Sequence, residues 1–144
     1  MRYIGSKSTL LDEIKKLLDS KVNGNEKTFL DLFAGTNSVA EFFKKDYKIL
    51  TNDNLYFSYI NSKAVIENNN KLLFNKLTFN PFEFLNDDKN IKLYKKSEYY
   101  TKNYTPIGNA MYLTEENGRR VDFIRNTIED WNEQGYLDHN EYYY

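Results

Sequence analysis

Apolar residues in the N-terminal third of the chain predict two strands with a short helix between them. Residues Phe29 to Phe33 form an apolar run of strand length that ends in a corner of small residues, and Tyr47 to Thr51 form a second run. Between them, apolar positions at helical spacing predict a helix of about two turns over Ser38 to Lys45. Because the links are short, we expect a βαβ unit with parallel strands and a right-handed crossover.

Helical periodicity continues on both sides of this unit. Before it, apolar residues keep to one face over Leu10 to Leu18, and Ser6 or Ser8 is placed to cap this helix. After it, residues 55–68 look helical, and residues 71–79 are apolar enough for a short helix or strand. Helices that alternate with strands in this way predict an α/β fold.

The C-terminal part of the chain is predicted to be mainly helical. A strong amphipathic helix ends at Gly135, and Asp138 is placed to cap the next helix. The apolar face of the longer helix consists of Val121, Ile124, Ile128 and Trp131. Residues 86–104, which precede it, are polar and carry many lysines and tyrosines. We therefore divide the chain into an α/β part over residues 1–85 and a mainly helical part over residues 86–144.

The corner after the first strand is typical of a ligand-binding turn. A turn between a parallel strand and its helix leaves backbone N–H groups free at the helix N-terminus, and Gly35 lets a ligand approach the main chain closely. Asp31, near the end of the first strand, and Asp53, after the second, should face the same crevice. A carboxylate there can accept hydrogen bonds from both hydroxyls of a ribose. Asp53 can equally cap the segment that follows it.

Composition excludes several kinds of chemistry. A hydrophobic content of 40% and a charged content of 28% over 144 residues are ordinary for one globular domain. No apolar run approaches the roughly 20 residues of a membrane span, and no signal-peptide pattern is seen, so we expect a cytoplasmic protein. The chain has no cysteine and a single histidine, His139, which argues against a zinc centre or a Ser-His-Asp triad. We expect no metal site.

Charge leaves DNA binding open. The formal net charge of -1 gives no global attraction to nucleic acid, so a local basic face would have to provide it. Candidate residues for that face are Lys95, Lys96, Arg119, Arg120 and Arg125. The lysines are interleaved with tyrosines, as on a nucleic-acid surface, but a solvated helix whose tyrosines pack on the core fits the pattern equally well.

Three short motifs in the first 53 residues carry a resemblance to a known family, and their order and spacing agree with that family. They are Arg2-Tyr3-Ile4-Gly5-Ser6-Lys7, Asp31-Leu32-Phe33-Ala34-Gly35-Thr36 and Asn52-Asp53. Together they resemble the N-terminal cofactor motif, the methionine-binding motif and the ribose-binding acidic position of the D12 class of adenine-specific DNA methyltransferases, which includes the bacterial Dam enzymes. Residues 106–144 look like the region that this class carries between its cofactor and catalytic motifs. The resemblance implies a partial Rossmann-like methyltransferase sheet followed by a helical region that faces duplex DNA.

The resemblance also implies S-adenosylmethionine as the cofactor. The residues that it places in the cofactor site are Tyr3, Lys7, Asp31, Phe33, Ala34, Gly35 and Asp53. Lys7 would contact the methionine carboxylate, and Asp53 the ribose. Asp31 would hold the methionine ends together with backbone N–H groups of the loop that follows it. Family members often have a second glycine where this chain has Asn37, a residue that tolerates a left-handed backbone.

The catalytic loop of this family, Asp-Pro-Pro-Tyr, does not occur in the 144 residues, and Asn80-Pro81-Phe82 is only superficially similar. In that loop the acid and a proline carbonyl accept hydrogen bonds from the adenine N6 amine, and the tyrosine stacks on the flipped base. We therefore expect the cofactor-binding part of a restriction-modification type adenine-N6 methyltransferase, inactive alone and without catalytic residues of its own. It would be a fragment, a truncated reading frame, or one half of a split enzyme whose second chain carries the loop.

Three other interpretations stay open. An NAD- or FAD-binding domain needs three glycines in its fingerprint, and the segment from Gly35 to Ala40 supplies only the first. A non-catalytic DNA-binding or assembly module would use the basic residues and would not need Asp31 or Asp53. A decayed remnant would have no present function, although the intact apolar faces argue against it.

Overall fold

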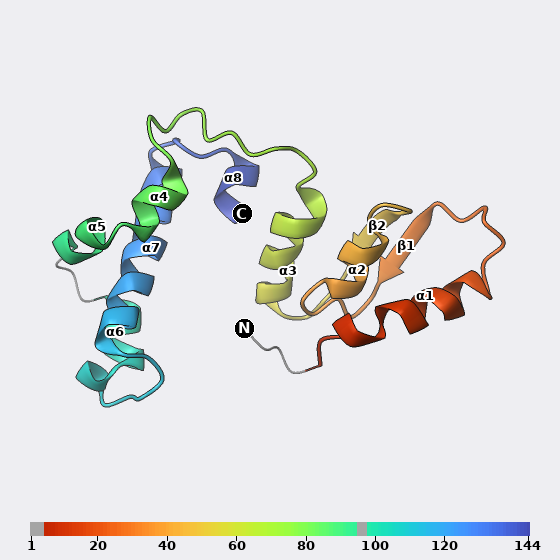
Figure 1. The fold of residues 1–144 in the computed structure, drawn as a ribbon, viewed down its shortest axis with the longest axis horizontal. Helices are drawn as coiled ribbons and strands as arrows, with labels where there is room; N and C mark the ends of the chain where they lie inside the picture. Colours follow the sequence, from red (N-terminus) through yellow and green to blue (C-terminus); the bar gives the residue numbers. More distant parts are fainter. Residues whose placement is uncertain (1–4, 95–97) are drawn as a thin grey trace. The chain divides into compact units, whose positions relative to one another are not determined.

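Figure 1 shows the fold as a computed structural model in which residues 5–94 and 98–144 are described. Within these ranges the protein combines a small parallel sheet with many helices, so it is a mixed α/β protein, as the sequence predicts. Three candidate residues, Tyr3, Lys95 and Lys96, lie outside the described ranges. A search of the described helices finds none that is long and apolar enough to span a membrane.

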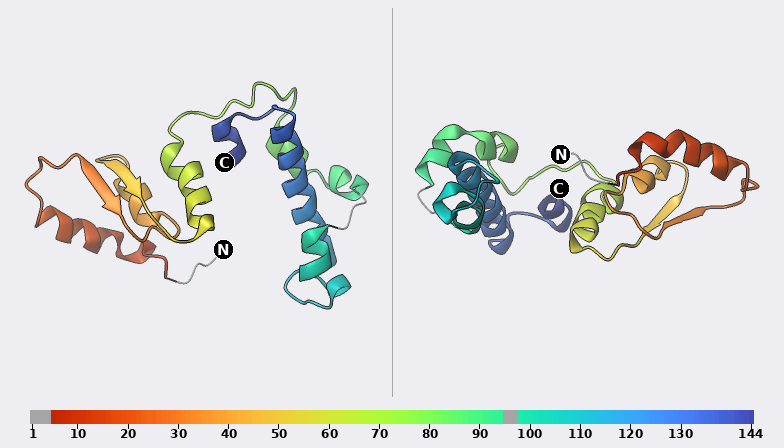
Figure 2. Two further views of the ribbon diagram at one scale, coloured as in Figure 1. Left: turned by 180° about the vertical axis from the view of Figure 1, so that it is seen from behind. Right: turned by 90° about the horizontal axis from the view of Figure 1, so that it is seen from below.

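The first of two compact units consists of Met1–Lys71 and Tyr143–Tyr144. Its elements are η1 (Ser8–Leu10), α1 (Leu11–Asp19), β1 (Thr28–Asp31), α2 (Ser38–Phe43), β2 (Lys48–Thr51), α3 (Tyr56–Ser62) and η2 (Lys63–Glu67). Strands β1 and β2 are parallel, with Asp31 opposite Thr51, which confirms the predicted pairing. Helix α2 connects the strands and packs against both of them (Figure 2).

The core of this unit is aromatic. The ring of Phe43 on α2 is fully buried and stacks on Phe29 of β1, with ring centres 4.8 Å apart. Tyr47 lies 6.1 Å from both rings, and Val39 and Ala40 complete the buried face of α2. Because side chains alternate along a strand, this packing covers one face of the sheet.

The second unit runs from Leu72 to Tyr142, and its secondary structure in the described residues is helical. Its elements are α4 (Pro81–Asn86), α5 (Asp88–Leu93), α6 (Tyr99–Tyr104), η3 (Pro106–Gly108), α7 (Glu115–Glu133) and α8 (His139–Tyr143), the last residue of which belongs to the first unit. Helices α5 and α6 pack against the long helix α7. The ring centre of Phe84, on α4, lies 6.1 Å from that of Phe123 and 5.6 Å from that of Trp131, and both of these are buried residues of α7.

Two local expectations are wrong. Residues 71–79 form neither a helix nor a strand, and Phe74 has a left-handed backbone with φ of 50°. An apolar segment without a period of 2 or 3.6 residues does not select an element, and here Phe79 packs on the aromatic residues of α4 and α7 instead. Ser6 and Ser8 do not cap α1, because the turn η1 precedes it and no side chain caps either element.

Other local expectations are confirmed. Helix α7 is followed by Gly135 with φ of 73°, and Asp138 Oδ1 accepts two backbone N–H groups of α8 at 2.8 and 2.9 Å. Asn80-Pro81-Phe82 begins α4: the side chain of Asn80 accepts the N–H of Phe82 at 3.0 Å, and Pro81 occupies the first turn. This segment is therefore a helix cap and does not form a catalytic loop.

Candidate cofactor site

The carboxyl ends of β1 and β2 bring two of the three motifs together. The backbone N–H of Asn52 donates to the carbonyl of Asp31 at 2.8 Å, and that of Ala34 donates to the carbonyl of Asn52 at 3.1 Å. Beyond this ladder, the N–H of Gly35 donates to Asp53 Oδ2 at 2.8 Å. The loops that follow the two strands therefore form one hydrogen-bonded corner.

The third motif, at the N-terminus, lies beside this corner. The hydroxyl of Ser6 is 3.3 Å from that of Ser38, the first residue of α2, which is in turn 2.7 Å from the hydroxyl of Thr36. Lys7 lies within electrostatic reach of Asp53. The described parts of all three motifs thus meet at one place in the first unit.

Asp53 is a half-buried carboxylate that the main chain holds in position. Its Oδ1 accepts the N–H of Leu55 at 2.9 Å, and its Oδ2 accepts the N–H of Gly35. These two hydrogen bonds, with a contribution from the charge of Lys7, hold the pKa of Asp53 below its ordinary value. Each carboxylate oxygen has two acceptor positions, so both oxygens keep capacity for a further donor. The local turn-stabilising role and the ligand-binding role predicted for Asp53 are therefore compatible.

The Asp31 carboxylate and the Phe33 ring are the groups of the corner that a ligand can reach most readily. Asp31 is half-buried, and among the described residues its Oδ1 makes a long contact of 3.4 Å with the N–H of Phe33. The ring of Phe33 is 77% exposed, which is unusual for so apolar a side chain. In contrast, the N–H groups of Ala34 and Gly35, which we expected to face a ligand, donate within the chain. A ligand here would meet the Asp31 carboxylate and the Phe33 ring.

Asn37, in place of the second glycine of the family motif, connects the loop to α3. Its φ of 62° confirms that asparagine accepts the left-handed backbone here, and the residue is fully buried. The side-chain amide donates to the carbonyl of Ser58 at 3.3 Å, and its oxygen accepts the hydroxyl of Ser62 at 2.7 Å. These partners are more than 20 residues away in sequence. No local sequence pattern could have indicated them.

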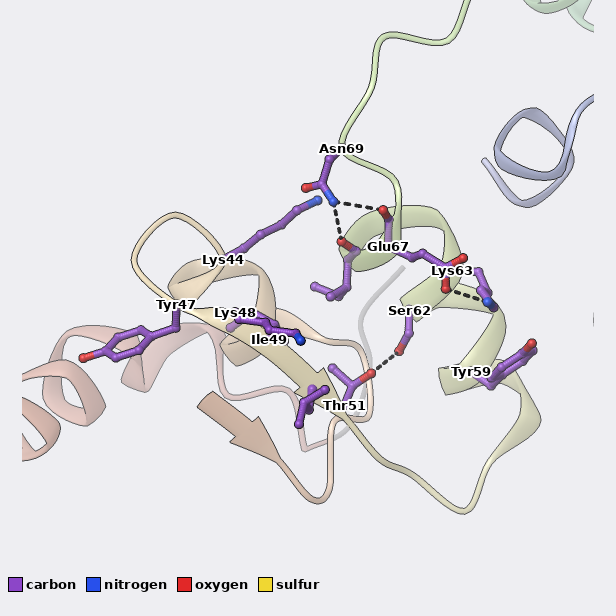
Figure 3. A pocket seen from close by; sticks show the side chains of 12 residues that line it. Lys44, Tyr47, Lys48, Ile49, Thr51, Tyr59, Ser62, Lys63, Glu67 and Asn69 are labelled. Atoms are coloured by element: carbon purple, nitrogen blue, oxygen red, sulfur yellow. Dashed lines mark hydrogen bonds and ion pairs between the residues drawn. The ribbon is translucent and has the colours of Figure 1, made fainter. Parts of the chain in front are cut away.

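A pocket of about 540 Å³ lies between β2 and the continuous helix α3–η2 (Figure 3). In Figure 3 the hydroxyl of Thr51 points to that of Ser62, at 3.2 Å. Lys44, which also lines the pocket, donates to the carbonyls of Val65 and Asn68 at 2.7 and 2.9 Å. None of the described cofactor candidates lines this pocket, so it is distinct from the motif corner.

The arginine candidates for DNA binding lie on α7 and are engaged by other side chains. Arg119 forms an ion pair with Glu115, and Arg120 forms one with Asp88 at 2.6 Å. Arg125 contacts the side chain of the next residue at 3.3 Å. The i, i+4 spacing of Glu115 and Arg119 was readable from the sequence, whereas the pairing of Arg120 with Asp88 links two helices and was not.

Comparison with known proteins identifies the family. Residues 3–144 match the D12 class N6 adenine-specific DNA methyltransferases. Over 149 residues the chain is 48% identical to the modification methylase StsI of Streptococcus sanguinis, covering all of this chain and 22% of that protein. Over 151 residues it is 42% identical to the type II methyltransferase M.FokI of Planomicrobium okeanokoites, covering all of this chain and 23% of that protein.

A shorter relative extends the comparison. The type II methyltransferase M.CviAII of Paramecium bursaria Chlorella virus 1 is 37% identical over 133 residues, which are 92% of this chain and 39% of that protein. No solved structure matches the chain. The chain spans 22% and 23% of the length of the first two relatives. From the match over residues 3–144 and these identities, the chain belongs to the D12 class N6 adenine-specific DNA methyltransferase family.

Proposed function

We propose that this chain is the cofactor-binding part of an enzyme that transfers a methyl group from S-adenosylmethionine to adenine N6 in duplex DNA. The observation that carries the proposal is the meeting of Lys7, Asp31, Gly35 and Asp53 at the carboxyl ends of two parallel strands. Membership of a DNA methyltransferase family supports this reaction class and S-adenosylmethionine as the methyl donor. The modification methylases among the relatives favour a role in restriction-modification.

The charges and shapes at the corner fit the groups of the cofactor. S-adenosylmethionine carries a positive amino group and sulfonium, a negative carboxylate, and a ribose with two neighbouring hydroxyls. We assign the amino group to Asp31, the carboxylate to Lys7 and the ribose hydroxyls to Asp53, whose oxygens keep acceptor capacity. Phe33 would contribute apolar surface, and the small side chain of Ala34 would leave room for close approach, with Tyr3 completing the site.

We further infer that the β1–α2–β2 unit is part of a Rossmann-like sheet. Leu30 and Leu50 project from the face opposite α2 and are 53% and 48% exposed. Parallel sheets are normally covered on both faces, so these residues support a further layer in the full enzyme. Within the chain we assign cofactor binding to residues 1–85 and DNA recognition to residues 86–144.

The bound cofactor would supply a methyl group activated by its sulfonium. The residues of this chain would bind and orient that group, but the sequence has no Asp-Pro-Pro-Tyr loop to hold the adenine amine in line with it. Positioning of this kind can lower a barrier by about 7–11 kcal/mol. We therefore propose that the loop is supplied from outside these 144 residues, in the same polypeptide or by a second chain, and that this chain alone gives no measurable turnover.

Calorimetric titration of S-adenosylmethionine into the purified chain tests the proposal. Asp53→Ala removes the ribose acceptor and should weaken binding by roughly tenfold or more, because hydrogen bonds to charged groups contribute about 1.5–3 kcal/mol. Asp46→Ala is the matched control, since Asp46 is an exposed aspartate of the same unit, outside the corner. Equal affinities of the two variants would refute the assignment of Asp53.

Two further titrations separate the rival interpretations. Tighter binding of NAD than of S-adenosylmethionine would favour a dinucleotide-binding domain. DNA binding without any cofactor binding, retained when Asp31 and Asp53 are replaced, would favour a non-catalytic DNA-binding module. In that second case the affinity should fall steeply with salt, because binding would depend on phosphate contacts.

A further inference from the structure

The two most exposed large apolar side chains among the described residues lie in the loop that follows α6. Met111 is 87% exposed and Tyr112 is 80% exposed, and Tyr99, on α6 itself, is 59% exposed. In Figure 1 this helix and loop lie at one end of α7, within the second unit. We call Tyr99, Lys102, Tyr104, Met111 and Tyr112 the aromatic tip. Contiguous exposed apolar surface of this kind marks a binding site.

The loop that carries the tip has a defined conformation. Its ends are joined by a hydrogen bond of 2.9 Å from the N–H of Leu113 to the carbonyl of Tyr104. Gly108 fits tightly inside it, since a Cβ there would lie 1.7 Å from the carbonyl oxygen of Lys102. The exposed side chains therefore project from a well-packed support, which reduces the entropy lost on binding.

Helix α7 anchors the tip through two residues. The carboxylate of Asp122, 1% exposed, accepts the N–H groups of Glu98, Tyr100 and Thr101 at 3.1, 2.8 and 2.8 Å and so caps α6. Gly118 lets the two segments approach closely, because a Cβ there would lie 2.4 Å from a side-chain carbon at the end of α6. The tip is thus fixed to the longest helix of the unit.

The chemistry of the tip matches nucleic acid. The ring centre of Tyr104 is 6.0 Å from that of Tyr99 and 6.0 Å from that of Tyr112. A hydrogen bond with Tyr99 raises the pKa of the Tyr104 hydroxyl above its ordinary value. Over residues 99–114 the only charged side chain is Lys102, and the carboxylates of Glu98 and Glu115 border this segment. Aromatic rings that stack on bases, combined with positive charge, are found on nucleic-acid surfaces, and Lys102 supplies positive charge here.

We propose that the aromatic tip is a DNA contact, in which Met111 and Tyr112 pack against bases and Lys102 approaches a phosphate. The inference rests on the proposed function, which makes duplex DNA the substrate. The aromatic tip, which carries little charge, then makes the main DNA contact in place of the arginines of α7, two of which are paired with carboxylates. Apolar side chains can enter a duplex between unstacked base steps, and an enzyme that flips a base creates such a step.

Fluorescence anisotropy of a short labelled duplex, titrated with the 144-residue chain, tests this proposal. The double variant Met111→Ser, Tyr112→Ser should bind roughly tenfold more weakly or worse, since stacking on one base accounts for about a fivefold to 150-fold change in affinity. Tyr136→Ser is the matched control, because Tyr136 is an exposed tyrosine beyond the other end of α7. Both substitutions are at exposed positions, and thermal unfolding verifies that the variants fold.

The possible outcomes separate this inference from the proposed function. Equal DNA affinity of the double variant and the Tyr136→Ser control would overturn the inference, as would an absence of DNA binding by the unsubstituted chain. The same would follow if the double variant lost only self-association, measured by sedimentation. S-adenosylmethionine titration is the independent readout: if the cofactor binds while the tip variant has no effect on DNA, the proposed cofactor role stands and the tip inference fails.

Discussion

Replacement of Asp122 should destabilise the second unit more than any surface substitution on the same helix. Its carboxylate is buried, and it satisfies three backbone N–H groups at the start of α6. Oδ2 accepts two of these groups and Oδ1 the third. Without it, three donors at the start of a short helix would lose their partner in a place that water barely reaches.

The expected magnitude follows from these contacts. A hydrogen bond to a charged group contributes about 1.5–3 kcal/mol, and a buried donor left unpaired costs about 1–3 kcal/mol. Asp122→Asn can keep the two bonds of Oδ2 but turns an amide N–H₂ towards the third N–H, so we expect a loss of about 2–4 kcal/mol. Asp122→Ala removes all three and should cost about 3–5 kcal/mol. With a urea slope near 1 kcal/mol/M for a small unit, the midpoint of Asp122→Asn should fall by about 2 M or more.

Trp131 provides the assay. It is the single tryptophan of the chain, it lies on α7, and it packs against Phe79 and Phe84, so its fluorescence reports unfolding of the second unit. Asp130→Asn is the matched control, because it removes the same charge from an exposed position of the same helix. If the urea midpoint of Asp122→Asn falls no further than that of the Asp130→Asn control, the argument that Asp122 holds α6 is refuted.

The pH dependence of unfolding gives a second check on Asp122. Burial by itself raises the pKa of Asp122, but hydrogen bonds from Thr101 and the neighbouring backbone outweigh it and hold the pKa below its ordinary value. The unfolded chain therefore binds the proton more readily than the folded chain. The stabilisation from Asp122 is complete above the unfolded pKa of about 3.9 and is lost as the pH falls through the folded value. The acid side of the stability profile should be flatter for Asp122→Asn than for the unsubstituted chain.

Three other substitutions have defined outcomes. Gly108→Ala places a Cβ against the carbonyl of Lys102 and should cost about 1–3 kcal/mol in the Trp131 fluorescence assay, and an unchanged midpoint would contradict the close packing of the loop. Asn37→Ala loses two buried hydrogen bonds and the tolerance of a left-handed backbone, so its thermal midpoint should fall below that of Asn37→Gly by the equivalent of about 1 kcal/mol. Asn80→Ala removes a helix cap and should cost about 1 kcal/mol without changing cofactor affinity.

Local patterns accounted for what the sequence predicted correctly. The two parallel strands, helix α7, the cap at Asp138 and the turn at Gly135 each depend on residues within a few positions of one another. The motifs after β1 and β2 also meet in space, because parallel strands leave their loops at the same edge of a sheet. The N-terminal motif lies beside them through Ser6, which is near Ser38. Local pattern and sheet geometry were therefore sufficient to predict that Asp31 and Asp53 lie at the same edge of the sheet.

Hydrogen-bond and ion-pair partners that are far apart in sequence could not be predicted from it. The buried bonds of Asn37 to α3, the ion pair of Arg120 with Asp88 and the capping of α6 by Asp122 join residues 21 or more positions apart. Each partner is an ordinary polar residue in its own segment, so neither composition nor periodicity distinguishes it. The prediction for residues 71–79 was wrong for a related reason, since the segment has no regular period and Phe79 packs on Phe84 of α4 and Trp131 of α7.

Asp53 and Asp122 show why a lowered pKa alone does not identify a binding residue. Backbone hydrogen bonds lower the pKa of both carboxylates. Asp53 stabilises the segment that leads into α3, and Asp122 stabilises the start of α6. The two carboxylates differ in exposure and in the acceptor capacity that is left for a ligand. Asp122 is 1% exposed and accepts three N–H groups, whereas Asp53 is half-buried and each of its oxygens accepts one N–H from the described residues. A ligand can reach only the second kind of carboxylate. Because the main chain already fixes its orientation, Asp53 would accept ribose hydroxyls in the proposed cofactor site without reorganising, and this combination of fixed geometry and spare acceptor positions supports the proposal.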